Sequence, residues 1–521
     1  MAFRKSLRAN KTNQTESFKR LKFRHSPLMT TLISFLKTYP ALSIVLGFQI
    51  FRLCLLPFMG LMPQDAYYHF YGENLALSYF DHPGMIGYIL AIFTGLFGKT
   101  VFVVKFADFV ITSLTLVSFH KLASLFLSHK KATNALLLLS TTVCASILSF
   151  NSTPDVPLLL FWTLSLIALY KAIFENKKSY WIAGGILMGL AFDSKYTGLF
   201  LQIGLLGFLL FSKEKRKLLT TPWPLVTLLI SALTTFPIWY WNYQNDFVSF
   251  LFQSSSRTGD ITKFQLKPNY FFGAIGHQLV LLGPILLVVL FNIVYKYLKK
   301  VFEKWQLPPS KTLFLLAFFV PTFAGFLSLT PVYWVKLNWL MPSYITGIIL
   351  ASYFFSKKMT KIHVYVSIIF HLAISFEILF YIVPIKSDDT WVGWEELTKQ
   401  TEEIQSHYPN TFIFSADNYK TTACMNFYSN QKIYSQNIIG QHALHFDYIG
   451  DDLSLLKGKN ALFLDSDKRF KNNEKKGKYR KDALNDYFSK VTELSPIFTK
   501  INGKNIRKFW VYYCENYSPK K

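Results

Sequence analysis

Apolar runs of about 18 or more residues recur along this 521-residue chain, from roughly position 40 to position 384. Each run is long enough to cross the ~30 Å hydrocarbon core of a bilayer. The whole chain is 51% hydrophobic and 17% aromatic, with a mean hydropathy of +0.25, which is too apolar for an ordinary soluble protein of this size. The sequence therefore predicts an α-helical, polytopic membrane protein.

The apolar runs and the breaks between them divide the chain into three parts. Residues 1–39 form a basic N-terminus with a short interfacial helix, residues 40–384 a transmembrane domain, and residues 385–521 a water-soluble domain. An apolar piece at 85–97 is short for a span and is expected to lie along the outer membrane face. We expect about eleven spans, within a range of ten to thirteen: 42–59, 101–127, 133–150, 157–174, 180–193, 197–211, 222–241, 271–295, 312–330, 339–355 and 362–384.

The net charge of +26 reflects 56 Lys and Arg residues against 30 Asp and Glu residues. These basic residues cluster at the N-terminus and in short breaks between apolar runs, where the positive-inside rule expects cytoplasmic segments. No zinc, helix-turn-helix or RNA-binding signature accompanies the charge, so we assign no nucleic-acid partner. The N-terminus lacks an apolar core followed by a small-residue cleavage site, which predicts an uncleaved first span. An odd number of spans places the C-terminal domain outside the cytoplasm.

The breaks on the opposite side from the basic ones carry the residues of chemical interest. These breaks are 60–82, 151–156, 194–196, 242–270 and 331–338. They hold Asp65, His69, Asp81, His82, Asp155, Lys195, Asn242, Asp246, Arg257, Lys336 and Asn338. Charged residues at the ends of apolar runs are costly and usually functional, which predicts a site on the outer face.

Asp65 and Asp155 are the candidate catalytic residues. Asp65 follows the first span in PQDAYYH, where a carboxylate could take a proton from an acceptor hydroxyl or hold it in line for attack. Asp155 lies in NSTPD between two spans, and Pro154 and Pro157 fix the turn around it. Each has a structural alternative. For Asp65 it is a solvated loop residue, and for Asp155 it is a helix N-cap, formed by Asp155 or by Thr153, which is compatible with a role in the site.

Basic residues in the outer breaks are the candidate partners of a phosphate group. Lys195, in DSKYTG, could neutralise the charge that builds on a lipid-linked phosphate, and Arg257 and Lys336 are rival or additional partners. The alternative for Lys195 is a lysine that reaches from the bilayer to the interface. The candidate substrate-binding residues are Tyr67, Tyr68, His69, Asp81, His82, Trp241 and Asn338.

No metal ligands are assigned, although a divalent cation is left open as a cofactor. Asp81 and His82 close the first outer loop before Pro83, and such a pair serves as a proton relay, as half of a metal site or as a plain turn. One His and one Asp alone make a poor metal site. Trp residues such as Trp241 either stack on a sugar or belong to the aromatic belt at the membrane boundary.

The sequence of the soluble domain predicts an α/β or α+β fold. We expect strands near 411–414, 432–434, 461–464 and 508–513, and helices near 419–428 and 481–487. Cys424 and Cys514 lie in this domain, and the sequence leaves open whether they form a disulfide or stay as buried thiols. No P-loop, dinucleotide fingerprint, HExxH or GxSxG motif is present, so nucleotide hydrolysis has no support.

Five segments, in this order, resemble a known family. They are QDAYYHFYGENLALSYFDHPGMIGYI, STPDVPLLLFW, GILMGLAFDSKYTGLFL, FPIWYWNYQNDFVSFLFQ and VYWVKLNWLMPSY, and NFYSNQKIYS in the tail agrees with them. The set resembles the bacterial branch of the GT-C integral-membrane glycosyltransferases, which groups dolichyl-phosphate-mannose protein mannosyltransferase-like enzymes with the lipid A aminoarabinose transferase. It covers essentially the whole membrane region.

The resemblance implies a GT-C fold with about 11–13 transmembrane helices and an extracytoplasmic α/β domain. It implies a transferase that uses a polyprenyl-phosphate-linked sugar on the external face of the bacterial inner membrane, with the site and the C-terminal domain in the periplasm. The presumed catalytic carboxylate maps onto Asp65, a second acid onto Asp155 and the basic residue onto Lys195. The sequence departs from the pattern at Gln64, which replaces one of two adjacent acids, and at His82, which replaces a lysine.

These observations predict an inverting transfer in which an acceptor attacks the anomeric carbon of the lipid-linked sugar and polyprenyl phosphate leaves. Asp65 would act as the base, Asp155 would orient the acceptor or the sugar, and Lys195 with Arg257 would stabilise the departing phosphate. Lipid A or a related glycolipid is the favoured acceptor, and a protein is the next. The alternatives are a lipid-linked sugar flippase or transporter and, behind it, a membrane anchor for the soluble domain.

Overall fold

A computed structural model describes residues 27–256, 265–385, 387–467 and 483–519. The chain divides into two compact units, residues 1–47 and residues 48–521. The first unit holds helix α2 (Pro27–Thr38), where a short interfacial piece was expected, and the beginning of α3 (Pro40–Leu55). The basic N-terminal residues 1–26 lie outside the described residues. The predicted domain boundaries near 39 and 384 stay predictions.

The rest of α3 and the other apolar helices belong to the second unit. Within the described residues, five helical segments are long and apolar enough to cross a bilayer. Three bent helix pairs raise this number to as many as eight. The five are Pro40–Phe58 (α3 with η1, Leu56–Phe58), α6 (Val101–Phe126), α9 (Asp155–Phe174), α17 (Ser310–Leu329) and α19 (Lys357–Phe380). The pairs are α7 (His129–Ser140) with α8 (Val143–Phe150), α12 (Pro222–Thr234) with α13 (Phe236–Gln244), and α15 (Pro268–Leu282) with α16 (Pro284–Lys304).

The expected span at 271–295 is not one straight helix. The chain turns by 117° between α15 and α16 at Gly283 and Pro284. Gly283 has a φ of +80°, which suits glycine, and Pro284 has no N–H to continue the first helix but fits the first turn of the next. Smaller bends of 61° and 45° break the expected spans at 133–150 and 222–241.

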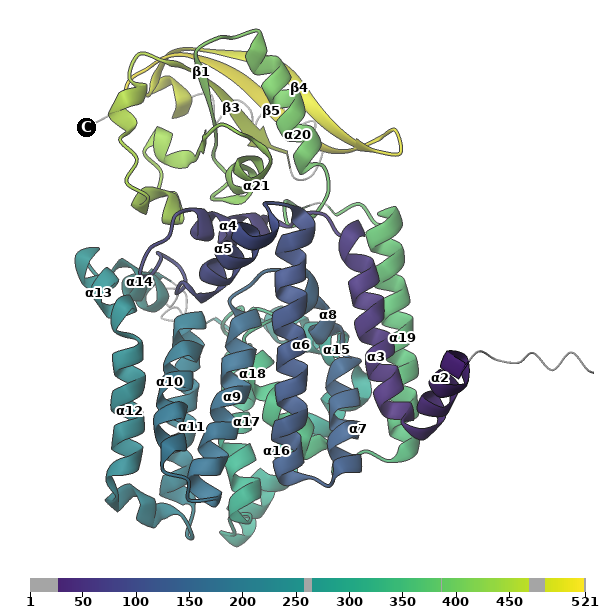
Figure 1. The fold of residues 1–521 in the computed structure, drawn as a ribbon. Coiled ribbons are helices and arrows are strands. Elements are labelled where there is room, and N and C mark those ends of the chain that lie inside the picture. Colours follow the sequence, from purple (N-terminus) through teal and green to yellow (C-terminus); the bar gives the residue numbers. More distant parts are fainter. Residues whose placement is uncertain (1–26, 257–264, 386, 468–482, 520–521) are drawn as a thin grey trace, which may run out of the picture. The chain divides into compact units, whose positions relative to one another are not determined.

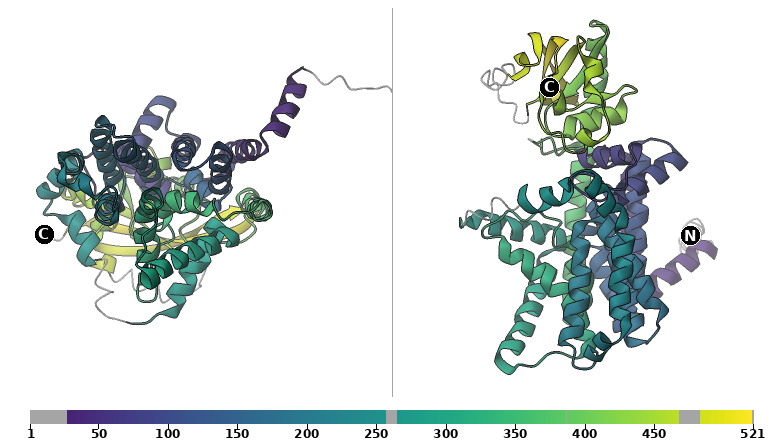
Figure 2. Two further views of the ribbon diagram at one scale, coloured as in Figure 1. Left: turned by 90° about the horizontal axis from the view of Figure 1, so that it is seen from below. Right: turned by 90° about the vertical axis from the view of Figure 1, so that its left-hand side faces the viewer.

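Shorter helices surround the long ones. α10 (Ser179–Ser194) and α11 (Leu199–Phe211) flank Lys195 as expected, with η2 (Tyr196–Gly198) between them. α10 packs against α9 and α12, and α17 packs against α11 and α18 (Met341–Ala351) (Figure 1). α4 (Pro63–Glu73) and α5 (Met85–Phe97) run crosswise to α6 (Figures 1 and 2). The remaining short elements here are η3 (Arg216–Thr220), α14 (Val248–Leu251) and the π-helix η4 (Phe252–Ser256).

The C-terminal part contains a five-stranded sheet in the order β2-β1-β3-β5-β4. β1 (Thr411–Ser415) pairs in parallel with β2 (Ile433–Tyr434) and β3 (Asn460–Ser466), and β3 is antiparallel to β5 (Lys504–Tyr517). This confirms the expected α/β or α+β fold, including all four expected strands and the helix near 419–428, here α21 (Lys420–Tyr428). The expected helix near 481–487 is helical only at 483–485 within the described residues. β4 (Phe488–Ile501), α20 (Trp394–Ser406), η5 (Gln436–Ile439), η6 (Leu444–Tyr448) and η7 (Leu453–Leu456) complete the part.

Candidate active site

The outer breaks identified in the sequence lie together at one end of the helices. Hydrogen bonds link them to one another across long sequence separations. Three of these bonds run from Ser249 Oγ to the Tyr79 carbonyl, from Ser152 N–H to Asp65 Oδ1 and from Lys267 N–H to the Pro331 carbonyl, each at 2.7 Å. The contacts agree with the expectation that these breaks share one face of the membrane region.

Asp155, Lys195 and Asn338 come from three different breaks and form one cluster. Lys195 Nζ donates to both carboxylate oxygens of Asp155, at 2.8 and 2.9 Å, and Asn338 Nδ2 donates to Oδ2 at 2.5 Å. Asp155 is fully buried and Lys195 is 5% exposed. Asp155 is the first residue of α9, where the helix N-terminus favours a carboxylate. Pro154 holds the N-cap position, so the alternative assignment of Asp155 or Thr153 as the N-cap is wrong.

A cavity of about 260 Å³ opens beside this cluster. Lys195, His82 and Gln253 are among its polar lining residues, and Phe200 and Phe326 are among its apolar ones. The complete lining is His82, Lys195, Tyr196, Thr197, Leu199, Phe200, Ile203, Gln253, Phe326 and Trp339. A cavity lined by an ammonium group and by several hydrocarbon side chains suits a ligand that is itself amphiphilic.

The segment that carries His82 is held from several sides. Tyr67 Oη donates to Asp81 Oδ1 at 2.9 Å, and Tyr71 Oη donates to the same oxygen. Gln253 Nε2 donates to the Asp81 carbonyl at 2.5 Å. Burial and the nearby Asp81 carboxylate raise the pKa of Tyr67 and of Tyr71 well above the usual range, so both hydroxyls keep their protons and remain donors. These bonds fix the backbone just before His82 enters the cavity wall.

The C-terminal part contacts the segment before His82 through η6. The backbone N–H of His445 donates to Tyr67 Oη at 3.3 Å, and the N–H of Phe80 donates to His445 Nδ1 at 3.4 Å. Burial lowers the pKa of His445 to about 3, so its ring is neutral and can accept this bond. Trp241 packs near the rings of His445 and Tyr448, at 6.3 and 5.8 Å between centroids, and is not part of the cavity lining.

Asp65 lies in a different setting from Asp155. Its side chain is fully buried, so the alternative of a solvated loop residue is wrong. It accepts hydrogen bonds from Met62 N–H and Ser152 N–H, both at 2.7 Å, and forms an ion pair with Lys105, which is fully buried too. Asp65 does not belong to the cavity lining. Its role as a base stays a prediction.

Lys105, beside Asp65, and Gln253, in the cavity lining, are among the residues that the sequence interpretation missed. Lys105 lies near the start of the predicted span 101–127, where one lysine among apolar residues was counted as part of the helix. The available signal was its charge, since an ionisable residue inside a span usually faces a partner. In the structure this partner is Asp65.

The other expected site residues have different surroundings. Tyr68 faces the His82 ring at 6.3 Å between centroids. His69 turns toward Phe427, at 5.0 Å, and toward Glu73. The Lys336 side chain is exposed and does not line the cavity, and Arg257 lies outside the described residues.

The described residues contain no group of three or more His, Cys, Asp or Glu side chains placed to hold a metal ion. Asp81 and His82, the pair considered from the sequence, do not form such a group with a third His, Cys, Asp or Glu of the described residues. Cys424 and Cys514 are both buried free thiols. Burial raises the pKa of both thiols, which makes them poor nucleophiles.

Comparisons with known proteins agree with this architecture. Residues 81–241 match the model of a family described as dolichyl-phosphate-mannose-protein mannosyltransferase. The matched stretch includes Asp81, His82, Asp155 and Lys195, and it begins after Asp65.

One relative matches over nearly its whole length. It is the lipid A galacturonosyltransferase RgtD of Rhizobium johnstonii, 24% identical over 497 residues, which cover 87% of this chain and 99% of the relative. Among solved structures, ArnT from Cupriavidus metallidurans bound to undecaprenyl phosphate matches with a TM-score of 0.56 and 12% identity, over 92% of this chain and 98% of that one. The fold is therefore that of ArnT, and the expected GT-C architecture with a C-terminal sheet is confirmed.

Proposed function

We propose that this chain, a membrane glycosyltransferase of the GT-C type, moves a sugar from a polyprenyl-phosphate-linked donor to a lipid A-like glycolipid. The observation that carries the proposal is the cavity beside Lys195 and Asp155, which combines one ammonium group with an apolar wall. The names of the relative and of the ArnT structure support the acceptor and the donor, respectively. A protein acceptor is the second choice.

The chemistry of Lys195 fits a phosphate ligand. An ammonium group has three N–H donors, and two of them point at the oxygens of Asp155. The third remains for a ligand in the cavity, where Lys195 is one of the lining residues. Asp155 and Asn338 together hold the ammonium group at the cavity wall, which removes the entropic cost of placing a flexible lysine when the donor binds. The polyprenyl chain would lie along Phe200, Ile203 and Phe326.

The proposed reaction is a displacement at the anomeric carbon. An acceptor oxygen forms a bond to this carbon, the bond between the carbon and the phosphate oxygen breaks, and the electron pair leaves with polyprenyl phosphate. Lys195 stabilises the negative charge on the leaving phosphate. An acceptor hydroxyl passes its proton to a base, whereas an ionised phosphate acceptor needs none. For Asp65 to act as this base, its carboxylate would have to separate from Lys105.

We place the reaction on the external face of the bacterial inner membrane. The basic breaks at the opposite end of the helices, such as Lys296–Lys300 and Lys357–Lys361, favour the cytoplasm by the positive-inside rule. The breaks that meet at the cavity then face the periplasm, and so does the C-terminal part that contacts them through His445.

The test is a reaction of purified protein with polyprenyl-phosphate sugars and lipid A in detergent or nanodiscs. We expect mass spectrometry to find free polyprenyl phosphate and a lipid A heavier by one sugar, and we expect both to form far more slowly with Lys195→Met. Mass spectrometry of lipid A from cells with and without the gene identifies the sugar. Donor that crosses the membrane of proteoliposomes with its glycosidic bond intact would instead indicate a flippase and overturn the proposal.

A further inference from the structure

We infer that Asp65 and Lys105 are positioning residues, whose ion pair fastens the loop 150–155 and thereby places Asp155 against Lys195. The inference deepens the proposed function and rests on it. It assigns Asp65 a part other than that of proton acceptor. The chain of contacts runs from α4 and α6 through this loop to the cavity.

The loop is tied at its first residue by Lys105. Lys105 Nζ donates to the carbonyl of Phe150, the last residue of α8, at 2.5 Å, and it forms the ion pair with Asp65. The carbonyls at the end of a helix have no partner within the helix, so a buried helix end needs a donor from elsewhere. Lys105 supplies this donor.

The loop is tied again two residues further on. Ser152 N–H donates to Asp65 Oδ1 at 2.7 Å, and Ser152 Oγ donates to Asp108 Oδ2 at 2.6 Å. Asp65 and Lys105 therefore hold the backbone on either side of Asn151. Three residues after Ser152, α9 begins with Asp155, whose carboxylate meets Lys195 at 2.8 Å. A shift of Ser152 would therefore move the carboxylate that orients Lys195.

The burial of Asp65 agrees with a positioning role. Its carboxylate has about four lone-pair sites, and Met62 N–H, Ser152 N–H and Lys105 already donate to three of them. Asp65 and Lys105 are both fully buried, and neither lines the cavity. A proton acceptor has to reach the reacting hydroxyl directly or through one water molecule. Asp65 meets the backbone of the loop instead.

The experiment uses full-length protein and compares Asp65→Asn, Lys105→Gln and the double variant with both changes. The double variant keeps an acceptor for the Ser152 N–H and a donor for the Phe150 carbonyl. Each single change leaves one buried group without its partner, whereas the double change removes both charges. We expect each single variant to lose thermal stability and activity. We expect the double variant to regain both, with activity within about tenfold of wild type. A double variant that is folded and inactive would overturn the inference, because the carboxylate would then be needed for the chemistry.

A second measurement covers the case in which the double variant does not fold. Polyprenyl phosphate, the leaving group of the proposed reaction, is titrated into purified wild type and Asp65→Asn, and its dissociation constant is measured. We expect binding to Asp65→Asn to be weaker by about tenfold or more, because Asp155 no longer holds Lys195 in place. A base that only takes a proton from the acceptor has no part in this binding. Unchanged affinity would therefore contradict the inference.

Controls separate this inference from the proposed function and from general destabilisation. Arg507→Met removes the cation of a buried ion pair in the C-terminal part, away from the cavity lining. We expect it to lower stability and to leave polyprenyl phosphate binding unchanged. If wild type neither binds polyprenyl phosphate nor transfers sugar, the proposed function fails, whatever the variants do.

Discussion

Two buried ion pairs in this protein are almost equal in geometry and different in surroundings. Lys195 and Asp155 meet at 2.8 Å, with side chains 6% and 0% exposed. Arg507 and Asp388, in the C-terminal part, meet at 2.9 Å, with side chains 5% and 0% exposed. Neither the distance nor the burial separates the two pairs, so the difference between them has to come from what surrounds the cation.

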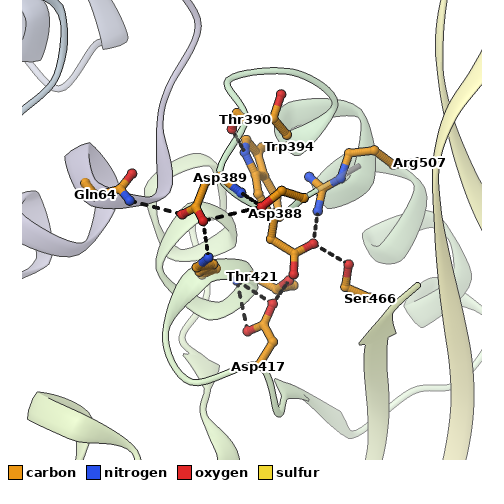
Figure 3. A network of polar contacts seen from close by, with 11 residues as sticks. Gln64, Asp388, Asp389, Thr390, Trp394, Asp417, Thr421, Ser466 and Arg507 are labelled. Carbon is orange, nitrogen blue, oxygen red and sulfur yellow. Dashed lines mark hydrogen bonds and ion pairs between the residues drawn. The ribbon is translucent and has the colours of Figure 1, made fainter. Parts of the chain in front are cut away.

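The cation of the C-terminal pair is enclosed by protein. The Arg507 guanidinium lies 3.7 Å from the centroid of the Trp394 ring and 4.6 Å from that of Phe509, and Ser466 Oγ donates to Asp388 at 2.5 Å. Figure 3 shows Arg507, Trp394 and Ser466 gathered around Asp388. Asp388 follows the last apolar helix, so the pair anchors the incoming chain to β5.

The cation of the membrane pair borders open space instead. Lys195 lines a cavity together with a few polar side chains and several apolar and aromatic ones, and its ammonium group has a donor left for a ligand. A buried ion pair alone is weak evidence for a site, because structural pairs are buried in the same way. The cavity beside one member of the pair is what indicates function here.

The largest effect is expected from Lys195→Met. Loss of the phosphate partner should lower kcat/KM by a factor of about 100 or more, and the buried Asp155 left behind should cost about 3–5 kcal/mol of stability. The measurements are sugar transfer and the thermal unfolding of detergent-solubilised protein.

The double variant Asp155→Asn with Lys195→Met sharpens this test. We expect it to regain much of the stability and none of the activity, whereas the double variant of Asp65 and Lys105 is expected to regain both. Recovery of sugar transfer in this double variant would mean that Lys195 serves only to balance Asp155, and the two pairs compared above would then be alike.

The second largest effect is expected from Arg507→Met, which changes the enclosed pair. Removing this cation should cost about 3–5 kcal/mol, because Asp388 is fully buried, while kcat/KM per folded molecule should stay at the wild-type value. The matched variant is Arg507→Lys, which keeps the charge but loses most of the stacking on Trp394. A large fall in kcat/KM at full occupancy of the folded state would show that the C-terminal pair also serves the reaction.

The sequence predicted both halves of this architecture but not every element in them. The apolar runs predicted the helices well, because a span needs only length and hydropathy to be recognised. The 117° turn at Gly283 was missed, because hydropathy does not change where the chain turns. β4 was missed because its first apolar residues recur every third position, from Phe488 to Ile497, and not every second one as in a typical strand. It also contains Pro496, which lies in the register shift between Leu494 and Ile497.

The site was predicted in pieces. Asp155, Lys195 and Asn338 were each recognised as a polar residue at the end of an apolar run, but the sequence did not indicate that they touch one another. Lys105 was missed because its partner, Asp65, lies 40 positions earlier in the chain. Pairings of this kind are set by how the helices pack, and hydropathy is read along one helix at a time.

A smaller effect, dependent on pH, is expected from His445, which joins the two regions. Its pKa in the folded protein is about 3, below the value of about 6.5 for an unfolded chain. The unfolded state therefore binds more protons between these values, so stability is constant above about pH 6.5 and falls as the pH is lowered. At pH 5 the expected loss from this residue is about 2 kcal/mol.

The control for this pH effect is His445→Asn, which keeps an acceptor for the Phe80 N–H and does not titrate in this range. Melting temperatures of both proteins between pH 7.5 and 5 give the comparison, and the wild type should lose more stability than the variant. If the melting temperatures of the two proteins fall equally with pH, the pKa of His445 would be the same in the folded and the unfolded protein.

The smallest effect is expected from Gln64→Glu, which tests a second contact between the two regions. Gln64 Nε2 donates to Asp389 Oδ1 at 3.1 Å, and Lys420 Nζ donates to Asp389 Oδ2 at 2.7 Å. Figure 3 shows Gln64 directed at Asp389 from the neighbouring helix. The Lys420 side chain lowers the pKa of Asp389 in spite of its partial burial, so Asp389 is ionised at neutral pH. A glutamate at position 64 would place a second negative charge beside it.

Because Asp389 is 45% exposed, solvent screens this repulsion, and the expected cost is below about 1 kcal/mol and falls as salt is added. The measurement is a double-mutant cycle with Asp389→Asn, in which the cost of Gln64→Glu should disappear. If Gln64→Glu costs the same stability with Asp389 and with Asp389→Asn, the cost would come from repulsion with Asp65, the next residue in the chain. The substitution would then act on the loop that holds Asp155, and a fall in polyprenyl phosphate affinity would accompany it.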